Sequence, residues 1–329
     1  MFHPAIRAAA ELVGARRPMT RELAAELASL EGGDILELVA LAHQVRNRFA
    51  PGTHLCSIVN AKSGACSENC RFCAQSAHHA TGIETYDLLD SETLVERAGQ
   101  AARAGIRRFG LVTSGFGHAG MDAQFEKALQ AIRAIRERLP QLEVCASFGV
   151  LGLEPVRALA ACGISHYNLN LQVAPGRYGE LVCDTHRVEE RIETVRLLKG
   201  HGIGVCCGGI IGVGETMAER LDLAFALREL AVDVVPLNVL VPIAGTPLEG
   251  RPPVPAAEVA KTFALFRLIH PTRVIKFAAG RETVMKDFQG LLLLSGANGM
   301  LTGGYLTTRG RQTDEDRAFV EQLAGFGNG

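Results

Sequence analysis

From His54 onward, short apolar segments alternate with longer amphipathic ones, and this alternation limits the fold more than any other feature of the chain. Eight apolar segments are predicted as strands: Leu55–Asn60, Arg108–Thr113, Leu142–Phe148, His166–Leu171, Gly204–Ile210, Val232–Leu240, Arg273–Ala278 and Asn298–Thr302. The segments between them are predicted as helices: Thr93–Ala104, Gln124–Arg138, Glu154–Ala161, Val188–His201, Met217–Leu230 and Ala256–His270. Eight strands with intervening helices over roughly 250 residues predict an α/β fold, a (β/α)8 TIM barrel. An open doubly wound sheet is the alternative, but it usually has fewer strands.

The segments on either side of this alternation are predicted to be helical additions to the barrel. Residues 1–52 form an N-terminal helical extension. Three helices are predicted there: Ala5–Val13, Thr20–Ser29 and Asp34–Phe49. The barrel takes residues 53–308, and residues 309–329 form a short C-terminal tail that is helical near Asp314–Leu323. We expect this tail to pack outside the barrel.

The composition excludes several classes of protein. The chain is 47% hydrophobic and 21% charged, which is a globular balance, and no apolar run reaches the roughly 18 residues of a membrane span. A net charge of −1 argues against a nucleic-acid partner. Nine cysteines in 329 residues are too sparse for a secreted disulfide framework, and no signal-peptide pattern opens the chain. We therefore expect a cytoplasmic protein that binds neither membrane nor nucleic acid.

Three cysteines are concentrated in one polar stretch, Cys66-x-x-x-Cys70-x-x-Cys73. The stretch follows the first predicted strand, so in a barrel it lies at the catalytic face. Three thiolates suit a soft metal centre and predict an iron–sulfur cube, in which three protein ligands leave one of the four irons open to a substrate or cofactor. The alternative is a structural zinc ion with His78 or His79 as the fourth ligand.

Further cysteines lie inside the predicted strands. Cys56, Cys145 and Cys206 belong to the first, third and fifth strands, and odd strands of a barrel contribute to the same interior layers. They therefore predict a second thiolate-bound cluster inside the barrel, although a buried cysteine is more often a small core residue. Cys207 is a further candidate ligand, but adjacent side chains of a strand face opposite ways, so only one of Cys206 and Cys207 can point inward. The two remaining cysteines are expected to be structural: Cys162 and Cys183.

Polar side chains also occupy apolar strands. Asn168 and Asn170 share one face of the fourth predicted strand, and Asn238 lies on the sixth. Because a buried amide is costly without hydrogen-bond partners, these residues predict the binding of a polar ligand such as a urea or a ribose. A network of hydrogen bonds within the core is the alternative.

An arginine and a glycine-rich turn complete the candidate site. Arg191 lies on the apolar stripe of the predicted helix Val188–His201, so it needs an anionic partner, either a structural carboxylate or the carboxylate of a cofactor. The segment Gly208–Thr216 ends the fifth predicted strand and opens a helix. Glycines there would let a ligand approach the backbone, and a tight turn is the alternative.

These residues resemble a known family. The cysteine motif, with Phe72 before its last cysteine, resembles the signature of radical S-adenosylmethionine (SAM) enzymes, and the longer run from Asn60 to Ser76 resembles the biotin synthase family. Other resembling segments follow in order between about residues 40 and 325: Tyr167–Asn170, Tyr178-Gly179, Gly208–Thr216, Asn238, Gly245–Leu248, Ala279–Glu282 and Leu306–Thr308.

The resemblance implies an enzyme that converts dethiobiotin to biotin. Cys66, Cys70 and Cys73 would hold a [4Fe–4S] cluster whose open iron binds SAM. One electron, from a donor such as flavodoxin or ferredoxin, would cleave SAM to methionine and a 5′-deoxyadenosyl radical. That radical would abstract hydrogen from dethiobiotin, and an auxiliary iron–sulfur cluster would supply the sulfur. The resemblance also implies a homodimer.

The resemblance further implies binding roles for individual residues. SAM-binding residues would be Phe72, Asn170, Gln172, Arg191, Gly208, Gly209 and Ile211, with Arg191 on the SAM carboxylate. Residues that hold the substrate would be Asn168, Asn170, Asn238, Thr307 and Thr308, with the two threonines near the substrate carboxylate.

Departures from the usual family pattern concentrate around the auxiliary cluster. Gly110 stands where the family has a cysteine ligand, Lys276 stands where it has an arginine ligand, and Cys56 replaces a hydroxyl residue close to that cluster. Outside this group, Gln172 replaces a ribose-binding aspartate. We hypothesise an auxiliary cluster of altered type, for example a four-iron one, bound by Cys56, Cys145 and Cys206 with Cys207 as an optional ligand.

Two alternatives remain open. A radical SAM relative that inserts no sulfur, such as a hydrogenase-maturation protein or a carbon-skeleton rearranging enzyme, is favoured by the loss of ligands at Gly110 and Lys276. The Ala74-Gln75-Ser76 run and the three asparagines favour biotin synthase instead. A redox-sensing iron–sulfur regulator is the third reading, and the lack of a nucleic-acid-binding motif argues against it.

Overall fold

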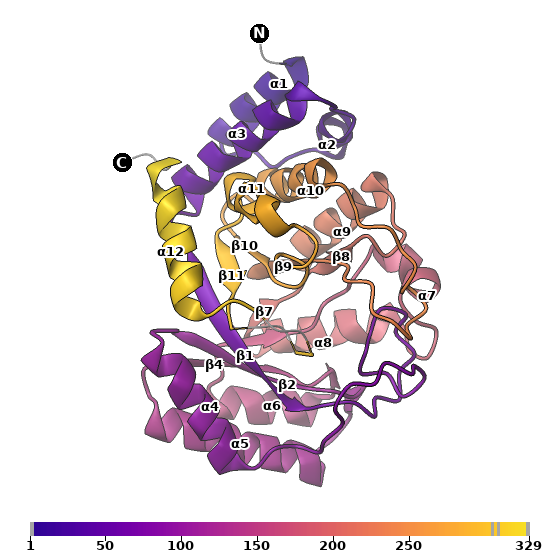
Figure 1. Ribbon diagram of the computed structural model, residues 1–329, viewed down its shortest axis with the longest axis vertical. Coiled ribbons are helices and arrows are strands. Elements are labelled where there is room, and N and C mark those ends of the chain that lie inside the picture. The colour runs from indigo at the N-terminus through magenta and orange to yellow at the C-terminus, as the bar shows by residue number, and fades with distance from the viewer. Residues whose placement is uncertain (1–2, 304–305, 308–309, 327–329) are drawn as a thin grey trace.

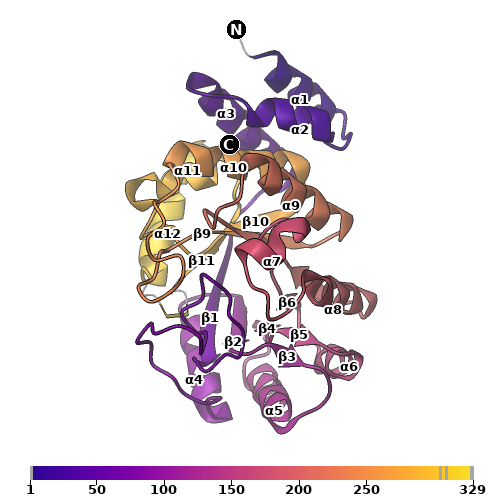
Figure 2. The ribbon, with the colours of Figure 1, turned by 90° about the vertical axis from the view of Figure 1, so that its right-hand side faces the viewer.

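A computed structural model describes residues 3–303, 306–307 and 310–326 as one barrel of eight parallel strands surrounded by helices (Figure 1; Figure 2), which confirms the predicted (β/α)8 fold. In order around the barrel the strands are β1 (His54–Lys62), β2 (Arg108–Thr113), β4 (Glu143–Ser147), β6 (His166–Asn168), β7 (Gly204–Cys206) continued by β8 (Gly209–Ile211), β9 (Val234–Val239), β10 (Val274–Phe277) and β11 (Gly299–Leu301). β10 pairs with β9 and β11, and β11 pairs with β1, so the first strand meets the last.

The fifth predicted strand, Gly204–Ile210, is interrupted between β7 and β8. It runs beside β9, where Pro236 has no N–H to donate to its neighbour. Gly208 lies against this proline, and a Cβ there would collide with the Pro236 carbonyl oxygen. The interruption thus depends on which residues strand pairing brings face to face, and local sequence pattern does not reveal that.

Helices cover the barrel where the amphipathic pattern predicts them: α4 (Ser91–Arg103), α5 (Ala123–Arg138), α6 (Leu153–Cys162), α8 (Val188–Gly200), α9 (Met217–Glu229) and α10 (Ala256–Ile269). Several short elements were not predicted: η1 (Pro175–Arg177), α7 (Tyr178–Leu181), η2 (Lys286–Phe288), α11 (Gln289–Leu294) and a small sheet of β3 (Gly117–His118) and β5 (Val150–Leu151). Among the described residues, no helix is long and apolar enough to cross a membrane.

The N-terminal extension consists of the three expected helices, α1 (Pro4–Gly14), α2 (Arg21–Ala28) and α3 (Gly33–Phe49), and it packs on the barrel helices α9 and α10 (Figure 1). Polar contacts hold it there. Lys261 of α10 donates to the carbonyls of Ala28 and Leu30 at 2.9 Å each. Arg228 of α9 donates to the Met19 carbonyl at 2.7 Å. The extension is therefore joined to the barrel by hydrogen bonds as well as by apolar packing.

The C-terminal segment forms α12 (Thr313–Leu323) and η3 (Ala324–Phe326), and α12 lies along the outside of the barrel (Figure 1). Its Asp316 is fully buried and accepts two hydrogen bonds, at 2.7 and 2.8 Å, from the guanidinium of Arg281 in the loop after β10. Glu282 also lies 2.7 Å from this guanidinium. A buried ion pair therefore fixes the tail to the barrel.

We expect Asp316→Asn to lower the free energy of unfolding by about 3 kcal/mol, because it leaves the buried Arg281 with only Glu282 as a counter-charge. Urea unfolding of the full chain measures this loss. Asp314→Asn, at an exposed position of the same helix, is the matched control and should change the free energy by less than about 0.5 kcal/mol. Equal losses in the two variants would contradict the expectation.

Candidate active site

A cavity of about 250 Å³ is lined both by the loop that follows β1 and by side chains inside the barrel. Six cysteines line it: Cys66, Cys70 and Cys73 from the loop, and Cys56, Cys145 and Cys206 from β1, β4 and β7. All nine cysteines of the chain are free thiols. The fold therefore brings together two cysteine sets that are far apart in the sequence.

The loop with the three cysteines is held by hydrogen bonds to the residues that follow it. The Cys66 amide donates to the Gln75 carbonyl at 3.1 Å, and the Ala77 amide donates to the Cys66 carbonyl at 2.8 Å. The Gln75 side-chain oxygen accepts from the Gly64 amide at 3.2 Å. Gly64 has a φ of 73°, and a Cβ there would collide with Thr85. These contacts hold the loop against the residues that follow it.

The chemistry of this loop fits an iron–sulfur cluster with three protein ligands, because its three thiols face one cavity. The zinc alternative requires His78 or His79 as a fourth ligand. Their Nε2 atoms instead lie 2.9 Å from the Ser67 carbonyl and 3.1 Å from the Cys70 carbonyl. Neither histidine lines the cavity. The structure therefore favours the cluster over zinc at this loop.

Inside the barrel, the second cysteine set surrounds a space that Gly110 leaves open. Gly110 pairs with Cys145 in the sheet register. A Cβ on Gly110 would lie 3.8 Å from the Cβ of Cys145 and 3.1 Å from Cγ2 of Ile58. A cysteine at this position would thus approach the same space, whereas in this chain Cys56 and Cys206 complete the lining.

Two cations, Lys276 and Arg108, line the same part of the cavity. Burial alone would lower the pKa of Lys276, but its interactions with Cys56 and Cys206 raise the pKa above its usual value. Burial raises the pKa of Cys145 to about 12, so this thiol needs a nearby positive charge or a metal to ionise at neutral pH. Lys276 supplies such a charge.

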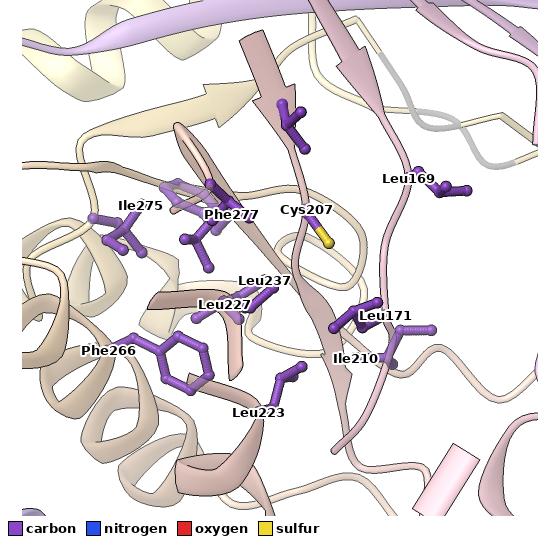
Figure 3. Close-up of a cluster of buried hydrophobic side chains, with 14 of the residues drawn as sticks. Leu169, Leu171, Cys207, Ile210, Leu223, Leu227, Leu237, Phe266, Ile275 and Phe277 are labelled. Carbon is purple, nitrogen blue, oxygen red and sulfur yellow. The ribbon is translucent and has the colours of Figure 1, made fainter. Parts of the chain in front are cut away.

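Cys207 does not reach the cavity. It is fully buried in the apolar core, and its sulfur points toward Leu169 and Leu171 (Figure 3). Cys206 is therefore the inward-facing member of the pair, as the alternation of strand side chains requires for one of the two. The optional role of Cys207 as an auxiliary ligand is not supported by its position.

Gly208, Gly209 and Ile211 also lie outside the lining of the cavity. The Gly208 amide donates to Oδ1 of Asn170 at 3.0 Å, and the Gly209 carbonyl accepts from Nδ2 of Asn238 at 3.2 Å. The side chain of Ile211 lines a separate small space next to α9. The two glycines thus allow close strand contacts that hold the asparagines, and their expected contact with SAM stays a prediction.

The three asparagines all line the cavity, as expected. Asn238 is used by the protein itself, since its Oδ1 also accepts from the Ala279 amide at 3.1 Å. Asn168 makes no side-chain hydrogen bond to any other described residue, and Nδ2 of Asn170 has no partner among them either. Asn238 therefore belongs to a hydrogen-bond network of the core. Asn168 and Nδ2 of Asn170 remain available to a ligand.

Gln172 presents an unsatisfied acceptor at the cavity. Its Oε1 is buried and has no hydrogen-bond partner within the described part of the chain. Its backbone has a φ of 70°, which is uncommon for a residue other than glycine and is found at ligand-binding sites. A buried carbonyl oxygen without a donor is costly, so a hydroxyl of a bound ligand is a natural partner.

Arg191 at the start of α8 lines the cavity without a carboxylate partner among the described residues. It donates to the Asn170 carbonyl at 3.1 Å and to Nε2 of His186 at 3.2 Å. On the other side of the ring, Nδ1 of His186 lies 2.6 Å from a carboxylate oxygen of Glu68. Glu68 and His186 therefore orient Arg191 and leave its charge available to a ligand.

Glu68 and His186 are not among the residues predicted from the sequence, and they lie 118 residues apart. Burial raises the pKa of Glu68, but hydrogen bonds from Thr185, Ser67 and His186 outweigh this effect and hold the pKa below its usual range. Glu68 is therefore a carboxylate at neutral pH. Its place between two motif cysteines is the one local signal that could have drawn attention to it.

Cys183, expected to be structural, lies beside the motif. Its sulfur and the ligand atoms of Cys70 and His186 all lie within 4.8 Å of one another. The hydrogen bond with Cys70, followed by the contact with His186, lowers the pKa of Cys183. Both ring nitrogens of His186 already have partners, and one partner is the cation Arg191. This trio is thus a poor site for a metal ion, and Cys70 stays available to the loop set.

Comparison with known proteins connects this geometry to a family. Residues 61–227 match the model of the Radical SAM superfamily, and residues 236–325 match the Biotin and Thiamin Synthesis associated domain. Biotin synthase of Chlorobium luteolum is 58% identical over 326 residues, which cover 99% of this chain and 98% of the relative. Biotin synthase of Pelodictyon phaeoclathratiforme is 56% identical over 331 residues, with the same coverage.

The chain belongs to the biotin synthase family. As a radical SAM protein, a member of this family uses a [4Fe–4S] cluster and SAM as cofactors. This membership confirms the resemblance seen in the motifs, and it favours biotin synthase over the radical SAM relatives that insert no sulfur.

Solved structures support the fold of this biotin synthase relative and nothing beyond the fold. Methylornithine synthase superimposes with a TM-score of 0.83 at 20% identity, covering 97% of this chain and 96% of that one. The [FeFe]-hydrogenase maturase HydG superimposes with a TM-score of 0.81 at 16% identity, covering 97% and 74% of the two chains.

The last two predicted substrate residues of the biotin synthase pattern have different outcomes. Thr307 is exposed and lines a neighbouring cavity of about 110 Å³, which shares Phe72 and Asn238 with the main one. Thr308 lies outside the described residues.

Proposed function

We propose that this chain converts dethiobiotin to biotin by radical SAM sulfur insertion. One observation carries the proposal: the loop cysteines and the strand cysteines line the same cavity. The first set can hold the cofactor that starts the reaction, and the second can hold the source of sulfur. A barrel interior brings the two next to one substrate and shields the reacting carbon atoms from water.

We assign the cofactor site to the loop and to the residues around it. Cys66, Cys70 and Cys73 would hold the [4Fe–4S] cluster, which together with bound SAM supplies the radical needed to break an unactivated C–H bond. Arg191 would bind the SAM carboxylate, since its guanidinium faces the cavity without a carboxylate partner among the described residues. The unsatisfied Oε1 of Gln172 would accept a hydrogen bond from a ribose hydroxyl.

We assign an auxiliary cluster to Cys56, Cys145 and Cys206, and this cluster would supply the sulfur. Three thiolates without the usual cysteine at Gly110 support a type that differs from the family pattern, such as a four-iron cluster. Lys276 would compensate the negative charge of these ligands, because its ammonium already faces them. Cys207 has no part in this assignment.

We assign substrate binding to the polar rim of the same cavity. Asn168 and the free Nδ2 of Asn170 would bind the polar ring of dethiobiotin, and Thr307 would lie near the substrate carboxylate. Thr308 has the same expected role, but the described residues do not include it. Asn238 would position these groups through its bonds to Gly209 of β8 and to Ala279, which follows β10.

We further propose a flavodoxin or ferredoxin as the electron donor and a homodimer as the assembly. A cytoplasmic location would suit a chain whose nine cysteines form no disulfide, because thiols and their metal complexes persist in a reducing compartment.

Anaerobic incubation of the reconstituted and reduced chain with SAM and dethiobiotin tests the proposal, with mass spectrometry of the products. Biotin, methionine and 5′-deoxyadenosine together are the expected products. SAM cleavage that does not depend on dethiobiotin and yields no biotin would refute the assigned substrate and point to a relative without sulfur insertion. Iron and sulfide analysis with Mössbauer spectroscopy tests the auxiliary cluster, and a single cluster per chain would refute it.

We expect His186→Ala to raise the KM for SAM about tenfold with a smaller effect on kcat, because Arg191 loses a charge-assisted hydrogen bond that orients it. Initial rates of SAM cleavage at varied SAM concentration measure both constants, and visible absorption checks that cluster content is unchanged. His201→Ala, at the far end of α8, is the control. An unchanged KM in both variants would show that Glu68 and His186 do not act through Arg191.

A further inference from the structure

A second large cavity, of about 540 Å³, lies between the N-terminal extension and the barrel. Its lining comes from the ends of α1, α3, α9 and α10, with Val232 and Arg273 just before β9 and β10. These residues precede the amino ends of their strands, whereas the cysteine loop follows the carboxyl end of β1. The cavity is therefore remote from the candidate active site, and nothing in the proposed reaction uses it.

The lining of this cavity is strongly basic. Five arginines line it, and no Asp or Glu does: Arg16, Arg17, Arg48, Arg228 and Arg273. Arg273 pairs with Asp233 at 3.4 Å. Within the described ranges, the other four form no ion pair with a carboxylate. Since the chain as a whole has a net charge of −1, this concentration of positive charge is local.

The carboxyl ends of helices offset part of this positive charge but not all of it. The four helices α1, α3, α9 and α10 all end at the cavity, and each carboxyl end carries roughly half a negative charge. Together they compensate about two of the five positive charges. Arg228 is also satisfied in part by the Met19 carbonyl. An excess of positive charge remains. Arg16, Arg17 and Arg48 are exposed, so this charge faces solvent and attracts anions.

Two of the arginines are held next to an aromatic ring. The guanidinium carbons of Arg16 and Arg48 lie 5.9 and 5.0 Å from the centre of the Phe49 ring. Arg16 has a φ of 56°, which favours glycine, yet an arginine occupies the position. Phe49 and Val13 give the cavity an apolar wall beside these charges.

We propose that this cavity binds a small molecule with at least two phosphate groups, such as a di- or triphosphate. Several guanidinium groups around one space suit phosphate oxygens, which they can bind in bidentate fashion. The volume falls within the range of small-molecule sites, and Phe49 holds two of the guanidinium groups at the cavity. Because the site joins α1 and α3 to α9 and α10, its ligand stabilises the packing of the extension on the barrel.

Calorimetric titration of the full chain with pyrophosphate, tripolyphosphate and ATP at low ionic strength tests the proposal. Pyrophosphate and tripolyphosphate lack the adenosine shared by ATP and SAM, so their binding separates this site from the SAM site. We expect saturable binding that weakens with added salt and raises the melting temperature. The double variant Arg16→Gln/Arg48→Gln should weaken binding about tenfold or more.

Arg97→Gln/Arg133→Gln is the matched control, because it removes two exposed arginines from α4 and α5. It should bind like the parent chain, and circular dichroism checks the fold of both double variants. Absence of saturable binding to all three probes overturns the proposal. Equal loss in the two double variants, or binding of a polyglutamate peptide without binding of pyrophosphate, also overturns it. SAM cleavage is measured separately, so failure here leaves the proposed function intact.

Discussion

Replacing Cys145 with alanine is expected to lower biotin formation by about a hundredfold or more while SAM cleavage continues. Cys145 lies inside the barrel with Cys56 and Cys206, whereas the proposed SAM cluster is held by the separate loop set. Loss of one thiolate removes a ligand of the proposed sulfur source. Biotin and 5′-deoxyadenosine, quantified by mass spectrometry in the same anaerobic reaction, measure the two steps independently.

Cys207→Ala is the matched control for this prediction. It removes a thiol of the same size from the residue next to Cys206, but this thiol packs in the apolar core and does not line the cavity (Figure 3). We expect it to retain biotin formation with only a modest loss of stability, about 1 kcal/mol. If Cys145→Ala still formed biotin at the parental rate, or if Cys207→Ala lost it, the assignment of the auxiliary ligands would be wrong.

Replacing Cys70 with alanine is expected to abolish SAM cleavage and biotin formation together. The residue is one of three loop thiols. A four-iron cluster held by only two protein thiolates is less stable, and two of its irons instead of one lack a protein ligand. Visible absorption near the sulfur-to-iron charge-transfer bands and iron analysis after anaerobic reconstitution measure cluster content. Product analysis with SAM and dethiobiotin measures activity.

Cys183→Ala provides the comparison, because its thiol lies next to Cys70 and hydrogen-bonds to it. We expect this variant to retain the cluster, since Cys183 does not line the cavity. A Cys70→Ala protein that keeps a full cluster and loses it only when Cys183 is also replaced would show that Cys183, rather than Cys70, is the third ligand.

The barrel could be predicted from the sequence because each strand and each helix has a local pattern of apolar residues. The break between β7 and β8 could not be predicted in the same way. It arises from Pro236 on β9, a residue that is remote in sequence and meets Gly208 only when the sheet forms. The short α11 after β10 has too few residues for a helical period to be recognised.

In the candidate site, too, local features could be predicted, whereas contacts between residues remote in sequence could not. The motif Cys66–Cys73 and the strand positions of Cys56, Cys145 and Cys206 are local features, and the fold brings these residues to one cavity as expected. The alternation of strand side chains requires that one of Cys206 and Cys207 points inward, but it does not say which one. Glu68 and His186 meet across 118 residues, so only the folded chain shows that they orient Arg191.

The pairing of β11 with β1 determines when this protein can become complete during its synthesis. The register joins His54 to Gly299, so the barrel cannot close before nearly the whole chain has been made. Cys73 is translated roughly 230 residues before Leu301, which corresponds to roughly 10–45 s at typical rates of synthesis. During that interval the barrel is not closed, and the loop thiols are not yet enclosed by it. Insertion of a cluster into a closed barrel must therefore follow translation, and a chain that stops short of β11 keeps the motif without the enclosed site.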